Sequence, residues 1–223
     1  FDNVILVVNT NNAFELGWVA DYPSITSVLW APGAGGDTCR SIADVLSGNV
    51  NPSGHLVDTF AYDAFSSPAM QNMGDMMMVN GGQDVEAAVF YDEGIYVGYK
   101  YYETRYFDKA LNQGNAGDYD YAATVQYPFG YGISYTAFDW SDFNLGQMDE
   151  TGDIEISVTV KNIGSVTGRD VVQVYLNAPY TDYDKANHIE KSAVTLVGFE
   201  KTGELQPDQS ETVTVTVNRK DFI

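Results

Sequence analysis

Strict alternation of apolar and polar residues is the feature that most constrains the fold of this 223-residue chain. Apolar side chains occupy every second position in 154–160, and the same period of two recurs in 172–176 and in 213–217. A strand with this period presents its apolar residues on one face, as strands that cover a core do. Turn-forming residues separate the runs at 162–164, 178–179 and 206–208. Residues 136–223 are therefore predicted to form an antiparallel β-sandwich.

The first 65 residues alternate strand and helix signals instead. Residues 4–8 and 25–30 are apolar runs of the kind found in parallel strands that are buried on both faces. A helix is expected after the second run, ending at Leu46 and capped at its start by Asp37 or Thr38. This order of elements predicts a parallel sheet in an α/β domain.

Residues 66–135 keep neither pattern for long, so the chain is divided into three parts, 1–65, 66–135 and 136–223. Tyrosines crowd the middle part, and the Gly-, Asn- and Asp-rich stretch 112–121 is expected to be an exposed loop. Five methionines in the middle part are expected to cover an apolar surface, because flexible thioethers fill irregular gaps. They are Met70, Met73, Met76, Met77 and Met78. We therefore expect two folded domains joined by an aromatic-rich connecting region.

The chain carries 31 acidic and 11 basic residues, which gives a formal net charge of −20. This charge argues against nucleic acid and anionic membrane surfaces as partners, because both require a basic footprint. With one cysteine and two histidines far apart, no internal disulfide and no metal site are expected. The start at Phe1 rather than at a methionine, and the end at Ile223, are interpreted as those of a piece of a longer protein.

A glycine-rich run at 32–36 lies between a predicted strand and a predicted helix, where phosphate groups can bind. The run lacks the Lys-Ser/Thr pair of a P-loop and the spacing of a dinucleotide fingerprint, and Asp37 would repel a phosphate. We interpret it as a tight turn. Cys39 falls on the apolar face of the helix that follows, and it is expected to be a buried, inert thiol.

Tyr91, Asp92 and Glu93 place an acidic pair within an aromatic stretch. Carboxylates can bond to sugar hydroxyls while aromatic ring faces pack on the apolar side of a pyranose. The other interpretation is a surface loop whose tyrosines pack between domains, and the residues alone leave both open. Tyr91, Asp92 and Glu93 are the candidate substrate-binding residues.

Several segments resemble sequences of glycoside hydrolase family 3, and they occur in the order found in that family. They are the helix-and-loop element at 43–56, the Glu-Gly-Ile string at 93–102, the Pro-Phe-Gly-Tyr-Gly string at 127–136, and three fibronectin-like segments at 158–162, 170–176 and 196–201. The resemblance implies a partial (α/β)6-type sandwich domain with a parallel sheet, followed by a fibronectin III-like antiparallel β-sandwich. A further strand is expected after Ile223, so the second domain is expected to be truncated.

The resemblance further implies a β-glucosidase-like enzyme that hydrolyses terminal β-linked glucosides with retention of configuration. In the family, a nucleophilic Asp lies on a barrel domain and an acid/base Glu lies upstream of the segment that matches 4–8. No catalytic residue is therefore assigned in this chain, which is expected to be inactive without the missing barrel domain, and no metal or organic cofactor is implied. The chain departs from the family pattern at Asp37, where Glu is common, and at Val57, where Pro is frequent. The alternative is a carbohydrate-binding or interaction module without hydrolase activity.

Overall fold

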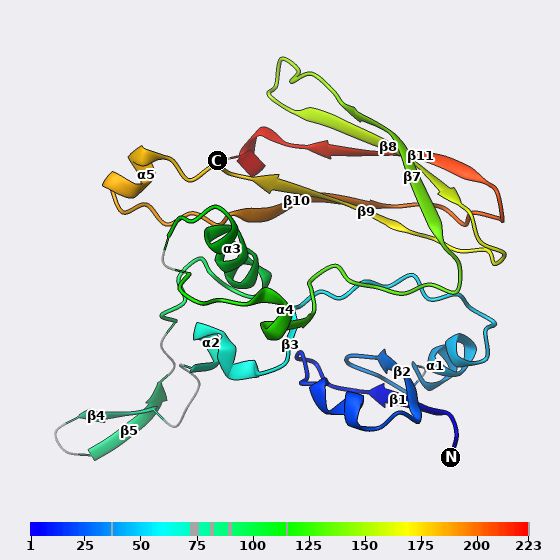
Figure 1. Ribbon diagram of the computed structural model, residues 1–223, viewed down its shortest axis with the longest axis horizontal. Coiled ribbons are helices and arrows are strands. Elements are labelled where there is room, and N and C mark those ends of the chain that lie inside the picture. The colour runs from blue at the N-terminus through cyan, green and yellow to red at the C-terminus, as the bar shows by residue number, and fades with distance from the viewer. Residues whose placement is uncertain (37, 72–75, 81–82, 89–90, 115, 223) are drawn as a thin grey trace. The chain divides into compact units, whose positions relative to one another are not determined.

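The computed structural model describes residues 1–36, 38–71, 76–80, 83–88, 91–114 and 116–222 (Figure 1). Contacts divide the chain into two compact units, each made of three segments. Unit 1 contains Phe1–Leu29, Asp58–Phe129 and Ala178–Ala193, and unit 2 contains Trp30–Val57, Gly130–Asn177 and Val194–Ile223. The three-part division at 65 and 135 stays a prediction, because these units are defined by contacts and not by sequence domains.

The N-terminal strands form where the apolar runs predict them. β1 (Val4–Val8) pairs with β2 (Ile25–Trp30) in a parallel two-stranded sheet, and the short 3-10 helix η1 (Gly17–Asp21) lies between them in sequence. The parallel sheet is thus confirmed, but the prediction that both of its faces are buried is wrong. Ile5 and Val7 are exposed on alternate positions of β1, because nothing in the described part of unit 1 covers that face.

The rest of unit 1 consists of short strands and helices. β3 (Phe60–Ala61) pairs antiparallel with β6 (Val125–Tyr127), and β4 (Met76–Asn80) pairs antiparallel with β5 (Gln83–Ala88). The helices are η2 (Ala64–Ser66), α2 (Pro68–Gln71), α3 (Tyr99–Ala110), α4 (Tyr121–Thr124) and α5 (Asp182–Ala186). Ala61, Tyr102 and Val125 are buried together as a small core, with further tyrosines packed against it. Of the predicted methionine surface, Met70 is exposed, and the side chains of the other four lie outside the described residues.

Unit 2 contains the predicted β-sandwich. One antiparallel sheet has the order β11-β8-β7, and a second antiparallel sheet pairs β10 with β9. The strands are β7 (Phe138–Leu145), β8 (Ile154–Asn162), β9 (Val171–Asn177), β10 (Val194–Lys201) and β11 (Ser210–Val217), followed by the 3-10 helix η3 (Arg219–Phe222). The alternating valines of β8, β9 and β11 form one buried cluster with Leu205. The period of two therefore predicted β8, β9 and β11 and the face that each of them buries, whereas β7 and β10 had no such pattern.

Asn162 ends β8 and joins the turns at one end of the sandwich. Its side chain is fully buried, and the side-chain Nδ2 atom donates to the carbonyl oxygens of Val166 at 2.8 Å and Leu205 at 2.9 Å. Its Oδ1 atom accepts from Thr136 Oγ1 at 2.7 Å and from the Gly164 amide at 3.1 Å. A residue that marks a strand end in the sequence thus forms hydrogen bonds with four polar groups from three different loops at this site.

Helix α1 (Thr38–Leu46) in unit 2 follows the glycine-rich run, as predicted. The Gly35 amide donates to Thr38 Oγ1 at 3.0 Å, which ties the turn to the start of the helix, while Asp37 lies outside the described residues. Cys39 is exposed, so the prediction of a buried thiol is wrong. The reason is that no residue of α1 is buried, and its apolar face has no cover within the described part of the chain. None of the helices in the described ranges has the length and hydropathy needed to cross a membrane.

Candidate functional site

The acidic and aromatic loop forms a tight turn just before α3 in unit 1. The Tyr96 amide donates to the Glu93 carbonyl at 2.9 Å, which closes the turn. Gly94 adopts a φ of +56°, a conformation that side chains rarely tolerate, and a Cβ atom there would lie 3.2 Å from Glu190 Oε2. Glycine at this position therefore allows both the turn and the close approach of the Glu190 carboxylate.

The three predicted site residues in this turn differ in their exposure to solvent. Tyr91 is 81% exposed and Asp92 is also exposed, whereas Glu93 is only 8% exposed. Glu93 Oε2 is buried without a hydrogen-bond partner among the described residues. A buried polar atom without a partner costs on the order of 1–3 kcal/mol, so such atoms call for a functional explanation. The ring of Tyr91 and the carboxylate of Asp92 are accessible to a ligand, while Glu93 reaches inward.

A segment between β9 and β10 lies close to this turn. Glu190, which approaches Gly94, precedes Lys191, and Lys191 Nζ donates to Asp184 Oδ2 at 2.7 Å. Asp184 also accepts from the Thr181 amide and hydroxyl, each at 2.7 Å. The hydrogen bonds from Lys191 and Thr181 lower the pKa of Asp184 to about 2. The carboxylate is therefore ionised in neutral solution, and it fixes the shape of the segment beside the turn.

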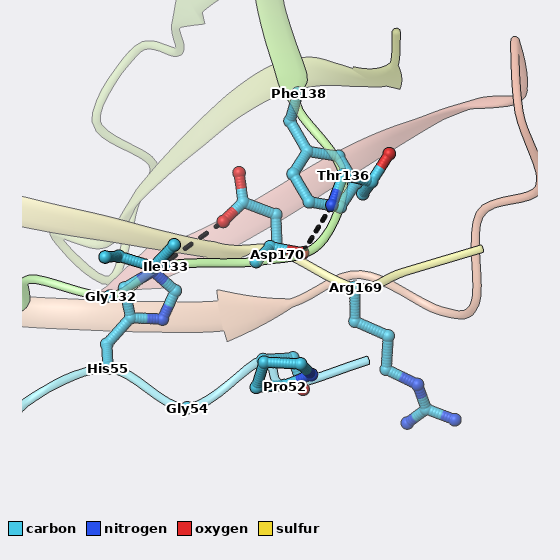
Figure 2. A pocket seen from close by; sticks show the side chains of 11 residues that line it. Pro52, Gly54, His55, Gly132, Ile133, Thr136, Phe138, Arg169 and Asp170 are labelled. Atoms are coloured by element: carbon cyan, nitrogen blue, oxygen red, sulfur yellow. Dashed lines mark hydrogen bonds and ion pairs between the residues drawn. The ribbon is translucent and has the colours of Figure 1, made fainter. Parts of the chain in front are cut away.

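Unit 2 contains a separate small cavity, shown in Figure 2, of about 170 Å³. The loop 52–55, the stretch 132–138 and the two residues before β9, Arg169 and Asp170, contribute its walls. Figure 2 shows the imidazole of His55 facing the carboxylate of Asp170, with His55 Nε2 3.8 Å from Asp170 Oδ1. Asp170 is held in place by Trp140 Nε1, which donates to its Oδ2 at 2.9 Å, and by the Val171 amide, which donates to its Oδ1 at 2.9 Å.

The electrostatics of this cavity favour a neutral imidazole. Burial lowers the pKa of His55 below its ordinary value of 6.5, the nearby Asp170 carboxylate opposes that effect, and Lys201 adds to it. His55 Nδ1 is buried without a hydrogen-bond partner among the described residues. The cavity lining has one carboxylate, Asp170, whereas hydrolysis of a glycoside requires a pair of them. We therefore interpret the His55–Asp170 pair as a contact that positions the loop 52–55 against the residue that precedes β9.

The sequence contained only part of the information on these sites. The composition of the loop indicated Tyr91, Asp92 and Glu93 directly, but the pairing of His55 with Asp170 had no local signal, because the two residues belong to segments far apart in the chain. Among the residues that the structure describes, no group of three or more His, Cys, Asp or Glu side chains could hold a metal ion.

Comparison with known proteins decides the family. Residues 1–99 match the glycosyl hydrolase family 3 C-terminal domain, and residues 170–223 match the fibronectin type III-like domain. The chain carries a family 3 glycosyl hydrolase C-terminal domain followed by a fibronectin type III-like domain. The predicted fold class, a partial α/β sandwich domain followed by a fibronectin-like β-sandwich, is thereby confirmed.

Curated relatives of these two domains are β-glucosidases. A β-glucosidase of Ruminococcus albus is 35% identical over 223 residues, which is all of this chain and 20% of the relative. The thermostable β-glucosidase B of Acetivibrio thermocellus is 32% identical over 99% of this chain and 25% of its own length. The chain therefore spans a fifth to a quarter of the length of these two relatives.

Solved structures agree with this assignment of the family 3 and fibronectin-like domains. A β-glucosidase from Paenibacillus barengoltzii has a TM-score of 0.77 and 32% identity, and the match covers 99% of this chain and 21% of that one. β-Glucosidase 3B from Thermotoga neapolitana, in complex with α-D-glucose, has a TM-score of 0.75 and 31% identity, with 99% of this chain and 26% of that one covered. The similarity extends over both units of the chain.

Proposed function

We propose that this chain is the non-barrel portion of a retaining β-glycosidase, β-glucosidase-like in its action on terminal β-linked glucosides. The observation that carries the proposal is similarity over the whole chain to β-glucosidases that are four to five times longer. Both catalytic carboxylates then lie on other parts of the full-length enzyme. In retaining glycosidases these two groups lie about 5–5.5 Å apart and flank the scissile bond.

Within that enzyme, Tyr91, Asp92 and Glu93 form part of the sugar site or of its rim. The exposed ring of Tyr91 offers a face to the apolar side of a pyranose, and Asp92 can accept hydrogen bonds from hydroxyl groups. Glu93 Oε2, buried and without a partner among the described residues, would gain a donor from a bound hydroxyl or from a neighbouring domain. A β-glucoside or an oligosaccharide is therefore the substrate that this loop contacts.

The barrel domain that the family implies is the other partner of this chain. Unit 1 exposes several large apolar side chains near its N-terminus, among them Val7, Trp18 and Tyr22. Exposed apolar groups of this kind are typical of a surface that another part of the protein covers. A barrel domain packed there would bury them.

Activity measured on two forms of the protein tests the proposal. The purified 223-residue chain is incubated with an aryl β-glucoside beside the full-length enzyme. We expect turnover by the full-length enzyme and none by the chain, because the catalytic carboxylates lie outside it. Turnover by the purified chain, beyond what trace contaminants explain, would contradict the proposed location of those groups.

The role of the loop is tested by Glu93→Gln in the full-length enzyme. We expect kcat/KM to fall about tenfold, which corresponds to roughly 1.4 kcal/mol of lost transition-state stabilisation. Glu150→Gln, which alters an exposed acid in unit 2, is the matched control and should leave kcat/KM unchanged. An unchanged kcat/KM in Glu93→Gln would mean that the loop has a purely structural role.

A carbohydrate-binding or interaction module is the second candidate, and the exposed ring of Tyr91 favours it. Turnover by the full-length protein discriminates between the two candidates. A full-length protein that binds cellobiose at millimolar concentrations without hydrolysing it would establish the module.

A further inference from the structure

A second cavity, of about 290 Å³, lies entirely within unit 1. One part of its wall comes from the turn before α3, from α3 itself and from the loop after it, and the other part comes from the segment 178–193. The lining residues that carry the argument are Tyr96, Tyr101, Arg105, Asp108, Gln113 and Tyr180. The sequence analysis noted the crowding of tyrosines but did not bring these residues together.

The wall formed by the segment 178–193 is held in place by polar contacts. Lys191 Nζ donates to Asp184 Oδ2 at 2.7 Å and to the Pro179 carbonyl at 3.1 Å. The Ala193 amide donates to Thr104 Oγ1 at 3.0 Å, which attaches the segment to α3. A cavity whose walls are fixed before a ligand arrives loses less conformational entropy on binding.

The wall formed by the loop after α3 depends on a glycine. The Gln113 amide donates to the Asp108 carbonyl at 2.8 Å, and Gly114 follows with a φ of +62°. A Cβ atom at Gly114 would collide with the carboxylate of Asp108. Only glycine therefore allows the loop to pass this close while the Asp108 side chain remains at the cavity.

The charges of the lining balance once Asp184, which lies outside the lining but pairs with Lys191, is included. Arg105 and Asp108 carry opposite charges, and the charge of Lys191 is matched by Asp184 at 2.7 Å. The guanidinium of Arg105 lies 6.0 Å from the ring centroid of Tyr101, and its Nη2 donates to the Ala116 carbonyl at 2.9 Å. The lining thus offers aromatic faces together with both donors and acceptors, without a net charge that would select an ion.

We propose that this cavity binds the ring of one neutral hexopyranose. A pyranose has apolar C–H faces that pack on tyrosine rings, and its hydroxyls both donate to carboxylates and accept from amides and guanidinium groups. The volume of about 290 Å³ is at the small end of ligand pockets, which span about 300–1,000 Å³, and it suits one ring rather than a longer chain. That the sugar is a glucosyl unit rests on the proposed function, whereas the class of ligand rests on the cavity itself.

Titration of the 223-residue chain with methyl β-glucoside, followed by saturation-transfer NMR and calorimetry, tests the proposal. We expect saturable binding with a Kd on the order of 1 mM. Tyr180→Ala removes a ring from the lining and should weaken binding at least tenfold. Tyr183→Ala is the matched control, because this tyrosine lies in the same segment, is 69% exposed and does not line the cavity. Sorbitol, which has no ring, should bind more weakly than the glucoside.

A second variant, at a different wall of the cavity, keeps the proposal testable if Tyr180→Ala does not fold. Gly114→Ala, checked for native circular dichroism, should also weaken binding, because the new methyl group displaces the Asp108 carboxylate. The absence of saturable binding would overturn the proposal, as would binding that survives both Tyr180→Ala and Gly114→Ala. Binding lost in Tyr91→Ala but kept in Tyr180→Ala would place the sugar on the exposed loop instead.

The outcomes separate this proposal from the proposed function. The titration uses no hydrolytic activity, so a full-length protein without glucosidase activity leaves its result standing. Turnover by the full-length enzyme, with no sugar binding by the chain, would overturn the cavity proposal alone. Tighter binding of glucose 6-phosphate than of methyl β-glucoside would overturn the assignment of a neutral ligand.

Discussion

Unit 2 and unit 1 bury their side chains in different ways. The core of unit 2 is built from valines of both sheets together with Leu205, and two buried polar residues, Asn162 and Thr202, lie outside that apolar cluster. The described core of unit 1 centres on Tyr102 between two small apolar residues, with Tyr101, Tyr119 and Tyr121 packed against it. Apolar burial dominates unit 2, whereas unit 1 combines the burial of aromatic rings with hydrogen bonds of their hydroxyl groups.

The hydroxyl groups in unit 1 need partners where they are buried. Tyr102 Oη lies 3.1 Å from Ser66 Oγ, and Tyr121 Oη donates to Glu103 Oε1 at 2.6 Å. Burial raises the pKa of Glu103, while the hydrogen bond from Tyr121 opposes that rise. Tyr119 Oη, in contrast, is buried without a hydrogen-bond partner among the described residues. Unit 1 therefore buries polar groups together with its rings, whereas the valine cluster of unit 2 has no polar side-chain groups that need partners.

Leu205→Ala should give the largest effect, because it removes a side chain that is 1% exposed at the centre of unit 2. We expect a loss of about 3 kcal/mol in the free energy of unfolding, measured by urea denaturation. Hydrogen exchange read by mass spectrometry should show the loss in peptides of unit 2. Ile163→Ala, at an exposed site, is the control and should cost less than about 0.5 kcal/mol. Equal effects of the two variants would contradict the view that apolar packing stabilises unit 2.

Asn162→Ala should have the next largest effect, about 2 kcal/mol, since it removes the hydrogen bonds from the Asn162 side chain to the Val166 carbonyl, the Leu205 carbonyl and the Gly164 amide. The same denaturation experiment measures it. Asn144→Ala, at an exposed position of β7, is the matched control. An unchanged free energy of unfolding in Asn162→Ala would show that water replaces the side chain at this end of the sandwich.

Tyr102→Phe probes unit 1 and should cost about 1 kcal/mol, because it deletes one hydroxyl contact and keeps the ring. Hydrogen exchange in peptides of α3 and η2 should report the loss, while peptides of unit 2 should be unchanged. Ser66→Ala also removes the bond from Ser66 Oγ to the Asp63 carbonyl, so the double variant with Tyr102→Phe should lose less than the sum of the two single losses. Additive losses would mean that the two hydroxyls do not interact, and the contrast between the two cores would weaken.

The smallest effect is expected at His55, the titratable group in the cavity of unit 2. Because its pKa in the folded chain lies below 6.5, the unfolded chain binds the proton more readily, and stability should fall as the pH drops below about 6.5. Asp170→Asn removes the carboxylate that raises the pKa, so the pKa of His55 should fall further. An NMR titration in a His188→Gln background measures it from the single remaining histidine. A rise in the pKa after Asp170→Asn would contradict the assigned contact.

The sequence was most informative where structure depends on neighbouring residues in the chain. The alternation in 154–160 predicted β8 and the burial of Val158 and Val160, because a strand's two faces follow from its period. The run at 4–8 predicted β1 but not the exposure of Ile5, since burial depends on what packs against a strand. Helix α3 was not predicted, because its tyrosines do not form a regular apolar stripe.

The candidate sites, like the strands, could be predicted only where their residues are neighbours in the sequence. Tyr91, Asp92 and Glu93 are consecutive, so their composition alone marked them as a candidate site, whose role remains a proposal. Tyr96 and Tyr180 line one cavity only because the segment 178–193 returns to unit 1, and no local pattern indicates such a return. Distant partners of this kind become visible only with the fold.

The division of each unit into three segments affects how the chain can fold as it is synthesised. Unit 1 lacks its last segment until Ala193 has left the ribosome, and β11 of unit 2 follows only at Ser210–Val217. Neither unit can therefore be completed while most of the chain is still being made, although β1 with β2 and β7 with β8 can pair earlier. The same arrangement means that no single cut of the chain releases either unit intact.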